Sequence, residues 1–311
     1  MGLDYLRTDT DRTQNVSLGR IAVRETLGCL TNLALGARYG QGVNKLSLPY
    51  WMLRAHIGAA RTPLDSEHQR VMTLETPRGP AHVCVRENQS DLLILWQVFL
   101  QRFYELDCMY ACAPVDRLDT VIDLGGNTGL SAAYLAARYR PSTLVVAEPI
   151  PENLAVLRRN AALSDTPWTI VPNALAGERG RLAFAVSGMW CNCTSVDAVA
   201  DLRRSRPYRL ENTMERPSIT VDAITMDDLL EQNGIEHVDL LKVDTEGGEA
   251  DTFARPQPWM AKVDRIVVEI HDKYIDGAVV RRTLAEAGFR QIPARRAEPD
   301  SPNPLELYAR A

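Results

Sequence analysis

Residues 121–129 read VIDLGGNTG, an apolar run that ends in a carboxylate and passes directly into a glycine-rich turn. A buried strand, such a turn and a helix from Leu130 together make the first half of a nucleotide-binding βαβ unit. Residues 144–147, LVVA, form a second apolar run that ends in Glu148, nineteen residues after Gly129. We therefore predict strand, turn, helix and strand, with an acidic side chain closing the second strand.

The glycines of this turn favour S-adenosylmethionine (SAM) over a dinucleotide. The dinucleotide fingerprint is G-x-G-x-x-G, and Leu124 stands where its first glycine would be if Gly126 and Gly129 are the last two. Asp123, directly before the turn, would repel a pyrophosphate held at the helix N-terminus. SAM carries no phosphate. Its ammonium group can be attracted by Asp123, and its ribose hydroxyls can donate to Glu148.

A purely structural interpretation of the turn is the alternative. Gly125, Gly126 and Gly129 would then serve only a tight strand-to-helix connection, and Glu148 would be a solvated charge. We favour the cofactor site, because further polar residues follow later strands of the chain. Asn127, in the same turn, is assigned to this predicted cofactor site.

Composition excludes several classes of function. The chain has 311 residues, 45% of them hydrophobic and 24% charged, as in an ordinary folded protein. No apolar run reaches the roughly 18 residues of a membrane span, and residues 1–7 lack an apolar signal core. A net charge of −5 argues against binding nucleic acid by neutralising phosphates. We predict a cytoplasmic protein with neither a nucleic-acid nor a membrane partner.

Six cysteines are present, and their spacing does not form a metal site. The pairs C-x3-C and C-x-C have no partners at zinc-site spacing, so reduced thiols are expected. Cys191 and Cys193 lie in a predicted loop, and their role is left open.

From about residue 114 onward, apolar strands alternate with helices, as a parallel α/β sheet requires. The predicted strands are 120–124, 144–147, 168–172, 238–243, 265–270, 289–293 and 305–309. The predicted helices are 130–140, 152–163, 227–232 and 277–287. The fold class is therefore α/β: a Rossmann-like, seven-stranded, mostly parallel sheet flanked by helices.

The region before this core, residues 1–110, is predicted to be an N-terminal extension of helices and a β-hairpin. The hairpin is expected over residues 71–86 because the pattern alternates around a Pro-Gly turn. A helix follows, with Ser90 as its N-cap and Asp91 in its first turn. The extension is a candidate surface for substrate contacts or for a homo-oligomer.

Residues 111–311 form the predicted SAM-binding domain, which contains one long irregular segment. Residues 187–217 are too long for a plain connection and include Arg203, Arg204, Arg206 and Arg209. Connections of this length are typical of lids that close over a site. We therefore predict a lid over residues 187–217.

Four stretches at strand ends carry a family resemblance. They are DLGGNTG at 123–129, EPIPEN at 148–153, LKVDTEGGE at 241–249 and VEIH at 268–271. The third is the most specific, because D-x-E-G-x-E directly follows a buried strand. Together they resemble the FkbM family of SAM-dependent methyltransferases. The resemblance implies a class I methyltransferase fold and O-methylation of sugars, polyketides or other specialised metabolites.

Three of the strand-end side chains are candidates for catalysis: Asp244, Glu246 and His271. A hydroxyl is a poor nucleophile while protonated, so a base within hydrogen-bond reach helps methyl transfer. We predict His271 as that base, because a neutral imidazole with a pKa of about 6.5 accepts a proton at physiological pH. Asp244 is assigned to the cofactor site as well, because it would lie near the methyl donor and orient the acceptor or His271. The alternatives are a structural histidine and helix-capping carboxylates.

Three further residues are assigned to the cofactor. Asn153 follows the acidic strand end and would cap a helix or face the ribose. Asn173 and Ala174 follow the third strand, where this class of fold usually meets the adenine ring. All three can instead be turn residues.

A Mg²⁺ ion is a further candidate, since Asp244, Glu246, Glu269, His271 and Asp272 offer oxygen and nitrogen ligands. Their spacing does not define an octahedral site, so no metal ligand is assigned. The function expected is SAM-dependent O-methylation of a small hydroxylated acceptor. The alternatives are N- or carboxyl-methylation and a non-catalytic SAM-binding subunit of a biosynthetic complex. The glycine spacing disfavours a dehydrogenase.

Overall fold

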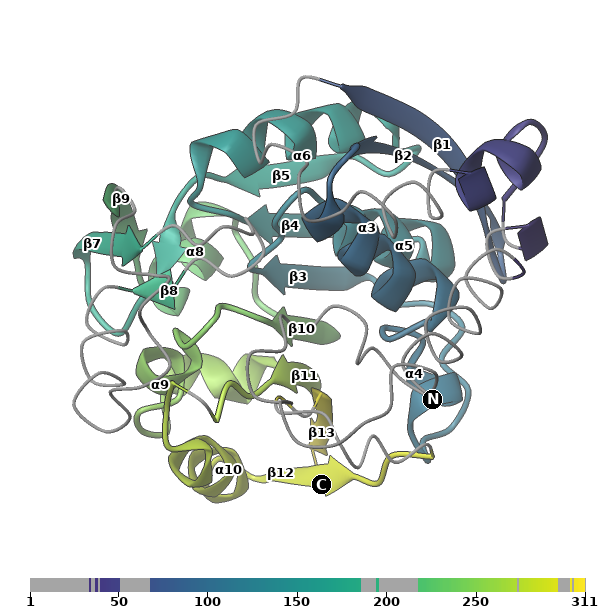
Figure 1. Cartoon of the computed structure of the whole chain (residues 1–311). Helices are drawn as coiled ribbons and strands as arrows, with labels where there is room; N and C mark the ends of the chain where they lie inside the picture. Colours follow the sequence, from purple (N-terminus) through teal and green to yellow (C-terminus); the bar gives the residue numbers. More distant parts are fainter. Residues whose placement is uncertain are drawn as a thin grey trace, which may run out of the picture.

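A seven-stranded sheet in the order β12-β13-β11-β10-β3-β4-β5 forms the middle of the computed structural model (Figure 1). The model describes residues 34, 37–38, 40–50, 68–185, 194–195, 218–272, 274–295, 303 and 305–310. The strands are β3 (Thr120–Leu124), β4 (Thr143–Ala147), β5 (Trp168–Val171), β10 (Leu240–Val243), β11 (Arg265–Glu269), β12 (Phe289–Ile292) and β13 (Leu305–Arg310). β13 pairs antiparallel with both neighbours, and the other pairs are parallel. The predicted sheet is confirmed.

Helices cover both faces of this sheet. They are α5 (Leu130–Tyr139), α6 (Pro151–Leu163), α8 (Met226–Gln232), α9 (Glu249–Thr252), the 3₁₀ helix Pro258–Lys262 and α10 (Gly277–Glu286). Successive strand residues point to opposite faces, so Val121 packs in one hydrophobic cluster with α5 and Ile122 in another with α8 and α10. Strands buried on both faces read as continuous apolar runs, which explains the pattern of the sequence.

The predicted hairpin is present as β1 (Gln69–Thr76) and β2 (Gly79–Arg86). Its apolar residues Met72, Val83 and Val85 are buried in the same cluster as α5. The hairpin therefore completes one face of the core. The role predicted for the N-terminal region in substrate or subunit contacts stays a prediction.

The helix after the hairpin begins differently from the prediction. It is α3 (Gln89–Leu95), continued by a π-helical turn (Trp96–Leu100) and followed by α4 (Leu106–Met109). Its N-cap is Asn88, not Ser90, because the Asn88 Oδ1 accepts a hydrogen bond from the backbone N of Asp91 at 2.8 Å. Asparagine and serine are comparable caps in sequence, and this hydrogen bond decides between them.

A second sheet, in the order β6-β9-β7-β8, lies beyond the carboxyl ends of the core strands (Figure 1). Its strands are β6 (Ala174–Leu175), β7 (Gly180–Ala185), β8 (Thr194–Ser195) and β9 (Ser218–Ile224). Of the predicted lid, only residues 194–195 are described, and they form β8. The rest of the lid, with Cys191 and Cys193, lies outside the described residues. Among the described residues, no helix is long and apolar enough to cross a membrane.

Candidate active site

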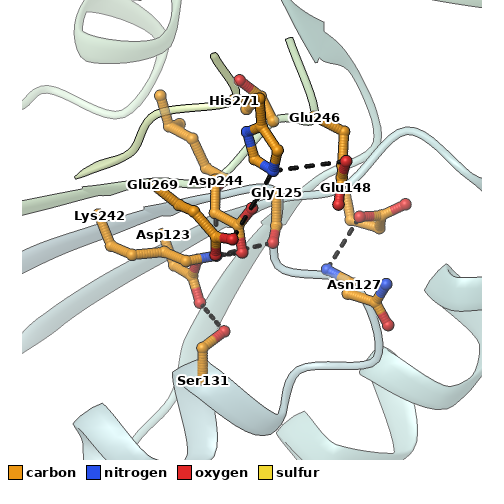
Figure 2. Close-up of polar contacts among 12 residues, drawn as sticks. Asp123, Gly125, Asn127, Ser131, Glu148, Lys242, Asp244, Glu246, Glu269 and His271 are labelled. Atoms are coloured by element: carbon orange, nitrogen blue, oxygen red, sulfur yellow. Dashed lines mark hydrogen bonds and ion pairs between the residues drawn. The ribbon is translucent and has the colours of Figure 1, made fainter. Parts of the chain in front are cut away.

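The carboxyl ends of β3, β4, β10 and β11 meet at one edge of the sheet, as parallel strands require. This edge brings together Asp123, Glu148, Asp244, Glu246 and His271, although they are far apart in the sequence (Figure 2). The structure therefore gathers the predicted strand-end residues at one place.

The glycine turn between β3 and α5 packs too closely for side chains. Gly125 has a φ of +74°, and a Cβ there would lie 1.8 Å from the backbone O of Asp244. A Cβ on Gly126 would lie 2.2 Å from Val146 Cγ1. The backbone N atoms of both glycines donate to the O of Ala147, at 3.0 and 2.9 Å. Close packing against β4 and β10 thus accounts for both glycines, and their contact with a cofactor stays a prediction.

Glu148 is a buried, fully oriented carboxylate at the end of β4. Its Oε2 accepts from the backbone N of Asn127 at 2.9 Å. Its Oε1 accepts from the backbone N of Ile150 at 2.9 Å and from Asn153 Nδ2 at 3.3 Å. Burial raises the pKa of Glu148 to about 7, although these donors oppose the rise. A solvated charge, the alternative considered for Glu148, is therefore wrong.

Asn153 is the third residue of α6 and does not cap it. The N-cap position is Ile150, and Asn153 is buried between Glu148 and the hairpin residue Arg86. Asn173 and Ala174 follow β5 at the same edge of the sheet, with Asn173 partly exposed and Ala174 buried in β6. Their contact with an adenine ring stays a prediction.

Asp123 already has a cation beside it. Its Oδ1 lies 2.9 Å from Lys242 Nζ, and its Oδ2 accepts from Ser131 Oγ at 2.6 Å. Lys242 also donates to the backbone O of Gly125 at 2.8 Å. Asp123 and Lys242 are both buried, so this ion pair lies in the core, next to the glycine turn. An interaction between Asp123 and the ammonium group of SAM stays a prediction.

Sequence reasoning missed Lys242, although a signal was present. Residues 240–243 read LLKV, and a lysine inside an apolar strand is seldom buried without a partner. The register of the sheet supplies that partner, because Lys242 lies opposite Asp123 in the β10–β3 pair.

His271 lies within a group of carboxylates and has no exposed surface. Its Nδ1 donates to Glu249 Oε1 at 3.2 Å, because a carboxylate can only accept. Its Nε2 lies 3.4 Å from Glu246 Oε2 and 3.8 Å from Asp244 Oδ1 (Figure 2). Glu249 also accepts from the backbone N of Thr245 and Gly247. Glu249 therefore fixes the orientation of the imidazole, with Nε2 turned toward Asp244 and Glu246.

The surroundings of His271 shift its pKa away from the value that the sequence analysis assumed. Burial lowers the pKa of His271, but the carboxylates of Glu246 and Glu249 outweigh it and hold this pKa well above its usual value. This shift favours the imidazolium form, whereas the sequence analysis expected a neutral imidazole. The pKa of Asp244 is also raised, but for a different reason. Burial raises the pKa of this carboxyl, and the positive charges of Lys242 and His271 oppose the rise.

The loop between β10 and α9 sets these positions. Glu246 has a φ of +50° and Gly247 one of +107°, so the chain turns sharply after Thr245. Glu249 is the first residue of α9, and its carboxylate accepts from the backbone N of Thr245 and of Gly247 in the turn before the helix. The D-x-E-G-x-E pattern thus combines two carboxylates near His271 Nε2 with a third that holds the turn and the imidazole.

Asp244, Glu246 and His271 also form a group with the donor set of a cation site. Each offers one ligand atom, and the three atoms lie within 4.8 Å of one another. Two carboxylate oxygens and one imidazole nitrogen suit a divalent cation. A second group of the same kind among the described residues, His237, Asp239 and Asp264, lies at the opposite end of β10 and β11.

The part of the chain that holds these residues matches a known protein family. Residues 123–291, more than half of the chain, match the sequence model described as "Methyltransferase FkbM domain". Methyltransferase 1 of Beauveria bassiana is 26% identical over 220 residues, which cover 68% of this chain and 87% of the relative. The 31-O-demethyl-FK506 methyltransferase FkbM of Streptomyces tacrolimicus is 27% identical over 233 residues, covering 67% of this chain and 84% of that protein.

A solved structure adds a weaker likeness. Methyltransferase FkbM from Methylobacillus flagellatus superimposes with a TM-score of 0.42 and 14% identity, covering 70% of this chain and 53% of that one. None of the names of these relatives points to Mg²⁺.

Proposed function

We propose that this chain, which belongs to the FkbM methyltransferase family, is a SAM-dependent O-methyltransferase of a small hydroxylated metabolite or glycoside. Two relatives have names that fit this reaction class: the 31-O-demethyl-FK506 methyltransferase, and the 2-O-methyltransferase NoeI of Sinorhizobium fredii, 25% identical over 169 residues. We propose a role in the biosynthesis of a specialised metabolite or a surface sugar.

The observation that carries the proposal is the position of a proton-accepting cluster beside the anchored Glu148. In methyl transfer, the acceptor oxygen forms a bond to the methyl carbon while the carbon–sulfur bond of SAM breaks. The sulfonium becomes a neutral thioether, and the hydroxyl proton must leave. A carboxylate at the carboxyl ends of β10 and β11 can take this proton at the edge where α/β sheets bind ligands.

We propose Asp244 as the group that receives the proton. Its side chain is 26% exposed, whereas His271 behind it has no exposed surface. An acceptor hydroxyl therefore meets Asp244 before it can reach His271. Because burial raises the pKa of Asp244, its carboxylate is a stronger base than one in water. His271, 3.8 Å away, would hold that carboxylate in place.

This assignment changes the roles given to the two residues by the sequence. His271 was predicted to be the base and Asp244 to orient it. The burial of His271 and the upward shift of its pKa favour the reverse, with His271 as the positioning residue. Glu246, whose Oε2 lies 3.4 Å from His271 Nε2, then balances the charge of the imidazolium.

For the cofactor, we propose that Glu148 accepts the ribose hydroxyls of SAM. It is held at the end of β4, where the acidic residue of a nucleotide-binding βαβ unit meets the ribose. Asn127 and Asn153 hold this carboxylate through hydrogen bonds. The buried Asp123–Lys242 pair would support the glycine turn, because Lys242 donates a hydrogen bond to the backbone O of Gly125.

An acceptor screen tests the function. The purified protein is incubated with SAM and with sets of hydroxylated sugars, glycosides and polyketides, and products are sought by a mass gain of one CH₂. We expect turnover with a hydroxylated acceptor and a strongly reduced rate after Asp244→Asn. Methylation confined to amines or carboxylates would contradict O-methylation, and SAM binding with no turnover on any acceptor would indicate a non-catalytic subunit.

A further inference from the structure

A line of buried polar contacts joins the hairpin to the proposed ribose site. Arg86, the last residue of β2, donates from Nη2 to Asn153 Oδ1 at 3.1 Å. Asn153 in turn donates from Nδ2 to Glu148 Oε1 at 3.3 Å. All three side chains are buried. Arg86 lies outside residues 123–291, so this line starts outside the matched family domain.

The guanidinium of Arg86 is held firmly from the opposite side. Its Nη2 and Nε lie 2.8 and 3.1 Å from Asp91 Oδ1, and its backbone N donates to Asp91 Oδ2 at 2.7 Å. Asp91 is fixed by the N-cap hydrogen bond from its own backbone N to Asn88. A buried ion pair is weak support for stability, because desolvation opposes it. The fixed geometry of the Arg86–Asp91 pair is better suited to orienting the neighbouring Asn153 side chain.

Arg86 decides which end of the Asn153 amide faces Glu148. A guanidinium has only donors, so it selects the carbonyl oxygen of the amide and leaves the NH₂ group toward the carboxylate. Without Arg86, the amide can turn over and present its oxygen to an oxygen of Glu148. The donor to Glu148 would then be replaced by a repulsive contact.

We propose that Arg86 is a positioning residue for the cofactor, acting through Asn153 to keep the Glu148 carboxylate ready to accept ribose hydroxyls. This inference rests on the proposed function, because it takes Glu148 as the ribose acceptor. It assigns a cofactor-tuning role to the hairpin and to the Arg86–Asp91 pair, both outside the matched domain.

The surroundings of Glu148 make such tuning effective. Its charged form is favoured by the backbone N of Ile150, by Asn153, by the backbone N of Asn127 and by Lys242. Burial nevertheless raises the pKa of Glu148 to about 7. The carboxylate is thus only partly ionised near neutral pH, and the loss of one donor shifts the balance further toward the protonated acid, which accepts less well.

The test is the affinity for S-adenosylhomocysteine (SAH), measured by calorimetry from about pH 6 to about pH 9, around the pKa of Glu148. In Arg86→Met/Asp91→Leu, both charges are removed together, so no buried charge is left unpaired. We expect about tenfold weaker SAH binding at neutral pH, a midpoint of the pH dependence moved to higher pH, and kcat at saturating SAM within about twofold of wild type. A purely structural role would not move the midpoint.

A second variant keeps the test decisive if the double substitution does not fold. Asn153→Asp preserves the side-chain shape and a partner for Arg86, but it removes the donor to Glu148. It should also move the midpoint to higher pH. An unmoved midpoint in this variant overturns the proposal.

Arg70→Gln is the matched control. Arg70 lies in the same hairpin and pairs with Glu87 at 2.5 Å, with 36% of its side chain exposed. Its loss should leave SAH affinity and the midpoint unchanged. Glu148→Gln separates the two claims: if it does not weaken SAH binding, the proposed cofactor site fails. If it does, while Arg86→Met/Asp91→Leu and Asn153→Asp bind as wild type, only the positioning role fails.

Discussion

Two carboxylate sites lie at strand ends on either side of β3, and they are built from different partners. Glu148, after β4, is held by two backbone N–H groups and one amide. Asp244, after β10, lies among charged groups, with Lys242 Nζ at 3.7 Å and His271 Nε2 at 3.8 Å. Neutral donors orient a carboxylate and leave lone pairs for a ligand, whereas charged neighbours set where protons reside. The first site suits cofactor binding, and the second suits proton transfer.

The largest effect expected from this comparison is on catalysis. Asp244→Asn should lower kcat by about 10² to 10⁴-fold, because the acceptor loses its base. SAH affinity should stay within about threefold of wild type, because the Glu148 site is untouched. Steady-state kinetics and calorimetry check both values. If Asp244→Asn keeps the wild-type kcat, Asp244 is not the proton-transfer site, and the proposed division of roles between Glu148 and Asp244 is wrong.

A smaller loss is expected for Glu148→Gln. It removes a charged acceptor from the ribose site, so SAH should bind about 10 to 100-fold more weakly, with kcat at saturating SAM little changed. In wild type, affinity should fall as pH drops below about 7, where Glu148 becomes protonated. Calorimetry across this range should show no such fall in the variant. If both proteins follow the same pH curve, another group controls cofactor binding.

His271→Asn should lower kcat by about tenfold, less than Asp244→Asn, because His271 acts through Asp244. Its folded pKa is raised above about 6.5, so the stability that it contributes is complete below that pH and is lost as pH rises through the folded value. The stability difference between wild type and variant should therefore shrink toward alkaline pH in denaturant titrations. A difference that grows with pH would mean that the imidazole is neutral and would return the base role to His271.

The smallest effect is expected from metal removal. The raised pKa of His271 favours a proton on Nε2, which would take the place of a cation in the Asp244–Glu246–His271 group, so we expect activity to survive dialysis against a chelator. Loss of activity that Mg²⁺ or Mn²⁺ restores would show that a cation occupies the place assigned to the proton.

The sequence predicted the sheet well because its signals are local. The apolar run 120–124 coincides with β3, and the glycine turn lies where the chain must leave the strand. β9 was missed, although Val221 and Ala223 alternate with exposed residues, because it follows the long segment predicted as a lid. The N-cap was placed at Ser90 because a single sequence does not show which of two polar residues, Asn88 or Ser90, accepts the Asp91 amide.

The sequence predicted which residues make up the candidate site, but it did not predict how their charges influence one another. Asp244, Glu246 and His271 were expected to share one edge of the sheet, and they do. The charge of His271 depends on Glu246 and Glu249, which act together only after the loop turns at Glu246. The partner of Asp123 required the register of β10 against β3. Such properties arise from tertiary contacts, which no local pattern specifies.

The atom that receives the methyl group tests the central claim most directly. With an acceptor from the screen and SAM carrying a ¹³C-labelled methyl group, carbon–proton correlation spectra of the product locate the label. The account predicts a methyl ether on a former hydroxyl, formed by wild type and nearly absent with Asp244→Asn. A label on nitrogen or on a carboxylate, or an ether formed equally fast by Asp244→Asn, would contradict it.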